Sequence, residues 1–135
     1  MSFSIVLPIR FGDCDFAGIA YYPRLLALVD AAIEDWTSAV IGVDRATMHG
    51  RDRRGLPTVK LTTSFEHPCR LGEEVTFTVQ TVAAGTSSVT LEISAEVAGA
   101  PRFTAQLVQV LMDIEHARKA PWPPEWRSRL EAAAR

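Results

Sequence analysis

The chain is poor in the residues that build metal sites and disulfide scaffolds. Among its 135 residues there are only two cysteines, Cys14 and Cys69. Two cysteines are too few for a disulfide framework or for a metal site made of cysteine alone. The three histidines are spread along the chain without the spacing of metal ligands. We therefore expect no metal site.

The sequence also has no excess of charge and no long apolar run. Its net charge is -2, which gives no reason to expect nucleic acid as a partner. The longest apolar stretch, Leu25–Val29, is far shorter than the ~20 residues of a membrane-spanning helix. The first residues alternate in polarity and lack the basic start of a signal peptide. We expect a cytoplasmic protein without a membrane partner.

What is present is an ordinary globular composition, with 47% hydrophobic and 22% charged residues. At about 150 residues per domain, the length corresponds to a single domain, residues 1–135. A chain of this size buries on the order of two thirds of its unfolded surface. One hydrophobic core is therefore expected to hold the fold together.

The first half of the chain predicts a strand, a loop and one long helix. Apolar residues alternate over residues 3–11, with Pro8 at an edge or a bulge. Residues 12–23 combine Gly, Asp and Pro and predict a loop. From Pro23 to Ile41 the apolar residues cover nearly half of a helix circumference, which favours a helix wrapped by a sheet. Gly42 suits the left-handed position after the helix end.

The second half predicts a polar loop, four strands and a short helix. The loop covers residues 43–57. The alternating segments are residues 59–65, 75–81, 89–97 and 103–112, and the short turns between them indicate consecutive antiparallel strands. The last of them is apolar on both faces and should lie inside the sheet. Residues 125–135 predict a short, exposed helix after a proline-rich stretch.

This order of elements predicts an α+β protein in which one long helix packs against an antiparallel sheet of about five strands. One face of such a sheet covers the helix. The other face, or an edge, is left with apolar surface, so we expect association with a second copy.

Chemistry is most readily placed in the loop before the helix. Asp13 and Asp15 flank Cys14 there. A helix start offers unpaired N–H groups and the positive end of the helix dipole, which stabilise an oxyanion. A carboxylate beside such groups suits acyl transfer to water. On spacing alone, however, aspartates more often cap turns.

The segment from Phe11 to Pro23, FGDCDFAGIAYYP, resembles the signature of the 4-hydroxybenzoyl-CoA thioesterase family of hotdog-fold proteins. A second, weaker match lies at Ser64–Pro68 with Gly72, and the resemblance covers most of the chain. It implies a hotdog fold, in which an antiparallel sheet wraps one long helix. It also implies hydrolysis of an acyl-CoA thioester, with an acyl group of the benzoyl or hydroxybenzoyl type. Coenzyme A is then part of the substrate, and no cofactor is implied.

The resemblance also assigns roles to residues of the motif. Asp15 corresponds to the catalytic carboxylate, which attacks the thioester carbonyl or activates a water. Tyr22 corresponds to the residue whose backbone N–H polarises that carbonyl, and Gly18 shapes the turn. Asp30 matches a helix position that faces the acyl pocket. Tyr21 and Phe16 are candidates for lining that pocket, whereas Asp13 has the more structural position.

One turn departs from the family pattern. Residues 83–88 are neutral here, whereas the aryl-CoA enzymes of the family carry arginines at the corresponding turn. The phosphates of CoA then need other cations. The candidates are Arg51, Arg53, Arg54, Lys60, Arg70 and Arg102. Each alone is more often a solvated surface charge, but three cations within residues 51–54 favour phosphate attraction.

Two other functions stay open at this point. One is a thioesterase for short or medium aliphatic acyl-CoA or for acyl carrier protein, and the other is a non-catalytic hotdog protein that binds acyl-CoA. The intact motif favours catalysis. In this fold the site lies between subunits, so the resemblance implies a dimer at least, or a tetramer of paired dimers.

Overall fold

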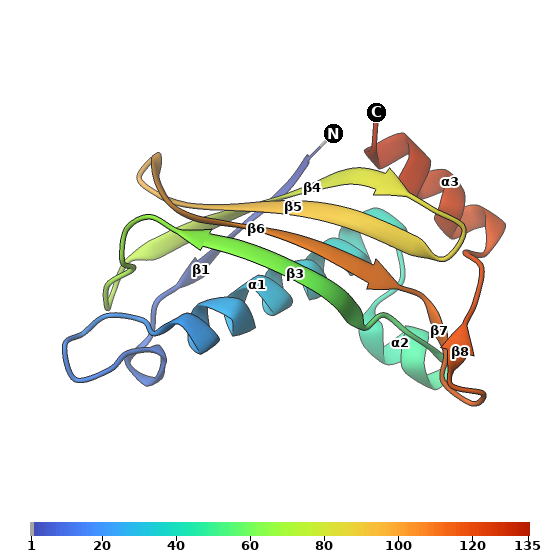
Figure 1. Ribbon diagram of the computed structural model, residues 1–135, viewed down its shortest axis with the longest axis horizontal. Coiled ribbons are helices and arrows are strands. Elements are labelled where there is room, and N and C mark those ends of the chain that lie inside the picture. The colour runs from blue at the N-terminus through green and yellow to red at the C-terminus, as the bar shows by residue number, and fades with distance from the viewer. Residues whose placement is uncertain (1) are drawn as a thin grey trace.

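The computed structural model describes residues 2–135 as two layers, a curved sheet and a helical layer beneath it (Figure 1). The elements in chain order are β1 (Ser2–Pro8), the 3-10 helix η1 (Phe11–Asp13), α1 (Tyr22–Trp36), the π-helix η2 (Thr37–Ile41), α2 (Arg45–Gly50), β2 (Arg54–Gly55), β3 (Thr58–Phe65), β4 (Glu74–Ala84), β5 (Ser88–Val97), β6 (Ala100–Val110), β7 (Met112–Asp113), β8 (Arg118–Lys119) and α3 (Pro124–Ala133).

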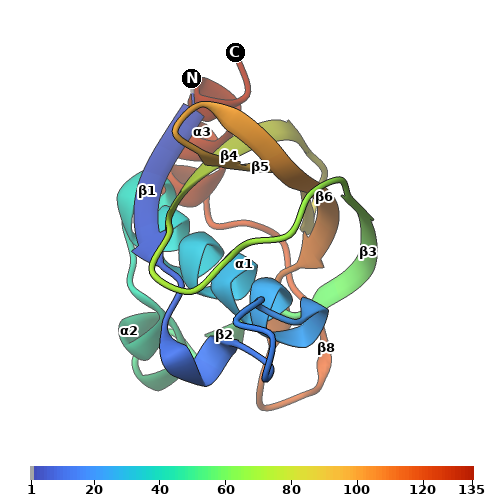
Figure 2. The same cartoon turned by 90° about the vertical axis from the view of Figure 1, so that its left-hand side faces the viewer.

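Five strands form one antiparallel sheet in the order β1-β4-β5-β6-β3. Figure 2 looks along α1 from the end where this helix begins and shows the sheet arching over it. The predicted fold class, a long helix wrapped by a five-stranded antiparallel sheet, is therefore confirmed. The prediction that residues 103–112 form an interior strand is also confirmed for β6, and β1 is an edge strand as its Pro8 indicated.

The core lies between α1 and the sheet. Leu25, Val29, Ile33 and Trp36 repeat at helical spacing and are almost completely buried on the side of α1 that faces the sheet. The indole N–H of Trp36 donates to the hydroxyl of Thr81 on β4 at 3.3 Å. A buried tryptophan that also satisfies its polar atom fixes how α1 sits under the sheet.

The end of α1 departs from regular helix geometry. The chain stays helical to Ile41 as predicted, but residues 37–41 wind as a π-helix. The Thr37 hydroxyl donates to the Ile33 carbonyl at 2.8 Å and accepts a hydrogen bond from Nε of Arg45 at 3.2 Å. Such side-chain insertions are a common cause of irregular helix turns. Gly42 ends the segment with φ 87°, in the left-handed position that the sequence indicated.

The predicted loop over residues 43–57 is wrong, because it contains α2 and β2. Asp44 starts α2 by accepting the backbone N–H of Thr47 at 2.7 Å. β2 pairs with β7, and β7 pairs with β8, in a small three-stranded sheet. A six-residue helix and two-residue strands are too short to produce a recognisable hydrophobic period.

Two boundaries also differ from the sequence prediction. β1 ends at Pro8, and residues 11–13 form η1 instead of continuing the strand. The C-terminal helix is present but is not the exposed helix that was expected, since Trp126 and Leu130 are buried. The amphipathic pattern of this helix is weak, so the sequence did not predict that these two large side chains cover the end of the core.

The sheet face turned away from α1 is polar. Ser4, Thr78, Ser94, Thr104 and Ser64 lie side by side in register, one on each of the five strands. A neighbouring row contains Gln80, Glu92, Gln106 and Thr62. The apolar surface that the sequence led us to expect therefore does not lie on this face.

The exposed apolar surface lies instead on the edge strand β3. Val59, Leu61 and Phe65 are 62%, 42% and 46% exposed. Leu61 and Phe65 pair with Leu107 and the buried Phe103, so they share the face that covers α1. Phe65 contacts the ring of Tyr22 at the start of α1 and is still partly exposed. No helix among residues 2–135 is long and apolar enough to cross a membrane.

Candidate active site

The segment before α1 folds back on itself and is held by a turn from the other half of the chain. The Ala20 N–H donates to the Cys69 carbonyl at 2.9 Å, and the Leu71 N–H donates to the Gly18 carbonyl at 2.9 Å. Gly18 has φ 73°, which a residue with a Cβ adopts only with strain. Residues 69–72 thus fix a loop that has little regular structure of its own.

Asp15 is held by one of its carboxylate oxygens only. Its Oδ1 accepts the N–H groups of Ala17 at 2.9 Å and of Ile19 at 3.4 Å, whereas Oδ2 has no partner among residues 2–135. The side chain lines a shallow hollow of about 470 Å³. The residues around it are Phe11, Cys14, Asp15, Phe16, Gly18 and Leu71. The turn thus orients the carboxylate and leaves one oxygen available to react.

Asp13 has the opposite surroundings. It is buried, its Oδ2 accepts the Arg10 N–H at 2.9 Å, and its Oδ1 pairs with Arg24 of α1 at 3.2 Å. Both oxygens are therefore occupied in tying the loop to the helix. This geometry agrees with the structural role expected for Asp13.

The start of α1 lies directly after this loop. Tyr21 occupies the position before the first helical residue, and Tyr22 is followed by Pro23. No group among residues 2–135 accepts a hydrogen bond from the Tyr22 N–H. A free N–H at this end of a helix, where the dipole is positive, suits a developing negative charge on a carbonyl oxygen.

Tyr22 also lines a second hollow, of about 280 Å³. Its walls are Ile19, Ala20, Leu25, Phe65, Glu66, His67 and Pro68. The rings of Tyr22 and Phe65 meet edge to face with their centroids 6.4 Å apart. Asp15 and Tyr22 thus flank residues 18–20 but face different hollows within one chain.

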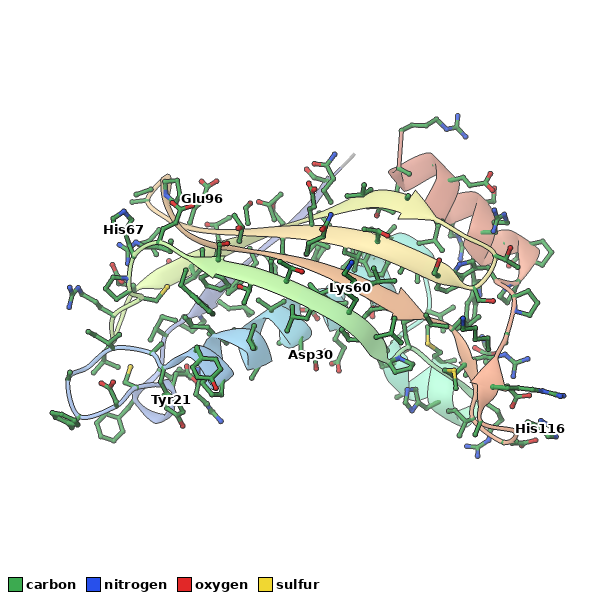
Figure 3. The ribbon with its side chains drawn as sticks, viewed as in Figure 1. Tyr21, Asp30, Lys60, His67, Glu96 and His116 are labelled. Atoms are coloured by element: carbon green, nitrogen blue, oxygen red, sulfur yellow. The ribbon has the colours of Figure 1, made fainter. Side chains whose placement is uncertain are left out.

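The other residues named from the motif are less closely associated with these hollows. Phe16 lines the hollow of Asp15 and is fully exposed. Tyr21 is 44% exposed and lines neither hollow, although it lies at the same end of the molecule (Figure 3). Asp30 is exposed, further along α1, on the side away from the sheet (Figure 3).

Of the predicted phosphate-binding cations, Arg70 and Arg102 line a hollow that adjoins that of Tyr22, whereas the other four lie elsewhere. Arg51 pairs with Asp52 at 2.9 Å, Arg53 with Glu115 at 3.4 Å and Arg54 with Asp113 at 3.8 Å. They belong to α2, β2 and their flanking residues, at the opposite end of α1 from Asp15 (Figure 1). Lys60 extends from β3 (Figure 3). One chain by itself does not bring these cations to Asp15.

Cys14 is not an activated nucleophile. Its thiol donates to the Arg10 carbonyl at 3.5 Å. Loss of hydration, and then the charges of Asp13 and Asp15, raise the pKa of this thiol above its usual range. A protonated thiol is a poor nucleophile.

Within the described part of the chain, no three His, Cys, Asp or Glu side chains are grouped to hold a metal ion.

Comparison with known proteins gives concordant matches. The thioesterase-like superfamily matches residues 9–130. The chain is 26% identical over 127 residues to a 1,4-dihydroxy-2-naphthoyl-CoA hydrolase of Synechococcus elongatus, covering 93% of each chain.

Solved structures match over nearly the whole chain as well. A 1,4-dihydroxy-2-naphthoyl-CoA thioesterase from Synechocystis matches with a TM-score of 0.86 at 20% identity, over 96% of each chain. A gentisyl-coenzyme A thioesterase matches with a TM-score of 0.83 at 22% identity, over 92% of this chain and 98% of that one.

Proposed function

The chain belongs to the thioesterase-like superfamily, and we propose that it hydrolyses an aromatic acyl-CoA thioester to the free acid and CoA. The observation that carries this proposal is the pair of groups beside residues 18–20. Asp15 has a free carboxylate oxygen and Tyr22 has a free backbone N–H. The predicted family and hotdog fold are confirmed, and the curated relatives are named as thioester hydrolases, which supports the predicted enzyme class.

In this proposal the thioester carbonyl lies over residues 18–20, between the hollows of Asp15 and Tyr22, so that both free groups reach it. The Tyr22 N–H donates to the thioester oxygen, which becomes negative as the carbonyl carbon is attacked. One such donor accelerates acyl transfer by about 10²–10³. A thioester has a good leaving group, so one carboxylate and one electrostatic donor suffice without a metal or a prosthetic group.

Two routes fit the free oxygen of Asp15. In the first, Oδ2 attacks the carbonyl carbon, the thiolate of CoA leaves, and water then hydrolyses the mixed anhydride and restores the carboxylate. In the second, Oδ2 takes a proton from a water molecule while that water attacks the carbonyl carbon. In the second route the proton held by Oδ2 then passes to the departing thiolate of CoA. Both routes thus release the acid and CoA and leave Asp15 ionised.

An aromatic acyl group is favoured by the surface that surrounds the Tyr22 N–H. The hollow there is walled by Tyr22, Phe65, Leu25 and Pro68. Aromatic side chains in edge contact leave ring faces and edges on which a planar acyl group packs. The relatives are named for aromatic acyl-CoA substrates, which supports the same class.

A second copy of the chain completes this proposal. β3 is an edge strand with an exposed apolar face, and pairing it with β3 of another copy would cover that face. Two identical strands that pair antiparallel run in opposite directions. The Thr58 end of one would lie beside the Phe65 end of the other, which brings Arg54 and Lys60 of one copy toward the Tyr22 hollow of the other. Two such dimers would form the expected tetramer.

The test is a panel of thioesters assayed by release of free thiol. We expect hydrolysis of benzoyl-, hydroxybenzoyl- and dihydroxynaphthoyl-CoA at rates well above those of acetyl- and octanoyl-CoA or an acyl carrier protein. Asp15→Asn should abolish most of this activity. Asp35→Asn, at an exposed position on α1, is the matched control. A preference for aliphatic chains would overturn the aromatic class, and binding without turnover would indicate a non-catalytic protein.

A further inference from the structure

A third hollow lies next to the one that Tyr22 lines. Its volume is about 320 Å³, and its lining residues are His67, Pro68, Arg70, Ala100, Pro101 and Arg102. These residues come from the segment after β3 and from the start of β6, which lie together at one end of the sheet. His67 and Pro68 line both hollows, so the two adjoin at these residues.

The wall of this hollow is held rigidly by a single carboxylate. Glu73 accepts two hydrogen bonds from the Arg102 guanidinium, at 2.7 and 2.8 Å, and the backbone N–H of Arg70 at 2.6 Å. Arg102 also donates to the Pro68 carbonyl at 2.6 Å. The charge of Arg102 is therefore balanced by Glu73, and its role here is to connect the two segments.

Two donors in the hollow are left without a partner. The Arg70 guanidinium forms no hydrogen bond or ion pair with the described residues, and the same holds for the ring of His67. The backbones of both residues are nevertheless fixed, since His67 donates its N–H to the Arg102 carbonyl at 3.0 Å. A fixed frame that presents a free guanidinium and an imidazole suits recognition of an anion.

The acidic groups nearby do not face this hollow. Glu73 is occupied by Arg102 and Arg70. Glu66 lines the hollow of Tyr22 only. Glu96 lies at the same end of the sheet (Figure 3) but does not line either hollow. The free charge of this hollow is therefore that of Arg70.

We propose that the hollow of His67, Arg70 and Arg102 binds an anionic group of the substrate, a carboxylate or a phosphate, through Arg70. This inference rests on the proposed function, because it assumes that a thioester occupies the adjoining hollow of Tyr22. An aromatic acyl-CoA carries such anions in two places, on its CoA phosphates and, in some substrates, on the acyl ring. Both sources present oxygens to which a guanidinium donates two parallel hydrogen bonds.

The kinetic test compares the wild type with Arg70→Gln on four thioesters: benzoyl-CoA, 4-carboxybenzoyl-CoA and the corresponding two thioesters of pantetheine. Loss of one charge-assisted contact should raise KM about tenfold and leave kcat unchanged. A rise for both CoA thioesters, and for neither pantetheine thioester, assigns the hollow to phosphate. A rise for the carboxylated acyl group on either carrier assigns it to the acyl ring. Unchanged KM for all four substrates overturns the proposal.

A binding measurement separates this inference from the proposed function. Titration calorimetry with adenosine 3′,5′-bisphosphate and with benzene-1,4-dicarboxylate should show about tenfold weaker binding of one of them to Arg70→Gln. Lys119→Gln, an exposed position on β8, is the matched loss of one positive charge. Equal weakening in both variants would mean a general charge effect and overturn the proposal. If the wild type hydrolyses no thioester, the proposed function fails, and the calorimetry still decides what the hollow binds.

Discussion

The two ends of α1 are built in contrasting ways. At its C-terminal end, apolar side chains are buried and polar groups are paired. Trp36 and Leu130 are fully buried there, and the Arg129 guanidinium donates to the Ile41 carbonyl at 2.8 Å. Among the described residues, Nη2 of Arg45 and Oε1 of Gln109 are buried without a partner.

At the N-terminal end of α1, aromatic side chains are exposed and several polar groups have no partner among the described residues. Phe11 is 83% exposed, Phe16 fully exposed, and Tyr22 64% exposed. Within the described part of the chain, Asp15 keeps a free oxygen, the Tyr22 N–H has no acceptor, and Arg70 has no ion-pair partner. The difference teaches that stability is concentrated at one end of α1 and groups available for chemistry at the other. Substitutions at the two ends should therefore affect different properties.

The largest effect is expected from Asp15→Asn. Removing the reacting carboxylate should lower kcat by about 10²–10⁴ while the melting temperature stays within a degree or two of the wild type. The variant keeps an Oδ1 that still accepts the N–H groups of Ala17 and Ile19. Asp13→Asn lies at the same end of α1 but changes a paired group. It should lower stability, because it weakens the ion pair between the buried Asp13 and the partly exposed Arg24. A large loss of stability in Asp15→Asn would contradict the division between the two ends.

Leu130→Ala should give the largest loss of stability. Leu130 is completely buried against the core, and such truncations cost about 2–5 kcal/mol of unfolding free energy. Phe16→Ala, near the N-terminal end of α1, should lower the unfolding free energy by less than about 0.5 kcal/mol, although it removes a larger side chain. Urea unfolding of both variants measures the contrast. Comparable losses would show that Phe16 packs against protein in solution.

Gly18→Ala should produce an intermediate effect that combines both properties. A Cβ at this position meets no atom within 4 Å, so the cost comes from the backbone, whose φ is 73°. That strain is worth about 1–2 kcal/mol. We also expect kcat to fall, because the Gly18 N–H donates to the Asp15 carbonyl at 3.0 Å. Gly12→Ala, which has open space and no positive φ, is the control and should change neither quantity.

The smallest effect concerns the pH dependence of stability at Asp44, near the C-terminal end of α1. The Thr47 N–H and hydroxyl donate to the Asp44 carboxylate and lower its pKa below the ordinary value of 3.8. A carboxyl whose pKa is lower in the folded protein stabilises it fully above the unfolded-state value. That contribution is lost as pH falls through the folded-state pKa. Urea midpoints of the wild type and Asp44→Ala should thus differ at pH 6 and converge at acidic pH below 3.8. An unchanged difference at low pH would contradict this origin.

The contrast between the two ends also explains what the sequence could predict. Periodic segments such as α1 and the strands of the large sheet were located correctly, because their apolar residues repeat along the chain. The elements around the C-terminal end of α1 were largely missed. α2 and β2 are too short to show a hydrophobic period. α3 was located, but its two large apolar side chains, Trp126 and Leu130, were not enough to predict that one face is buried.

For the site, the sequence placed Asp15, Gly18 and Tyr22 because they lie within one short motif. Their closeness in sequence keeps them near the start of α1, but the turn at residues 69–72 is what fixes the loop that carries Asp15 and Gly18. The hollow of His67, Arg70 and Arg102 joins two segments more than thirty residues apart, and only the fold brings them together. Arg51, Arg53 and Arg54 stood out as a cluster, but the sequence did not show that each has an acidic partner. Arg51 pairs with the adjacent Asp52, whereas Arg53 and Arg54 pair with Glu115 and Asp113, which lie far along the chain.

The row of serine and threonine side chains across the outer face of the sheet has a consequence for the size of the protein. A hydroxyl both donates and accepts, so it joins the surrounding water network in whichever orientation it takes. That face consequently needs no helices above it, unlike a sheet whose two faces are both apolar. A third layer is unnecessary, and a chain of 135 residues can enclose a long helix with five strands.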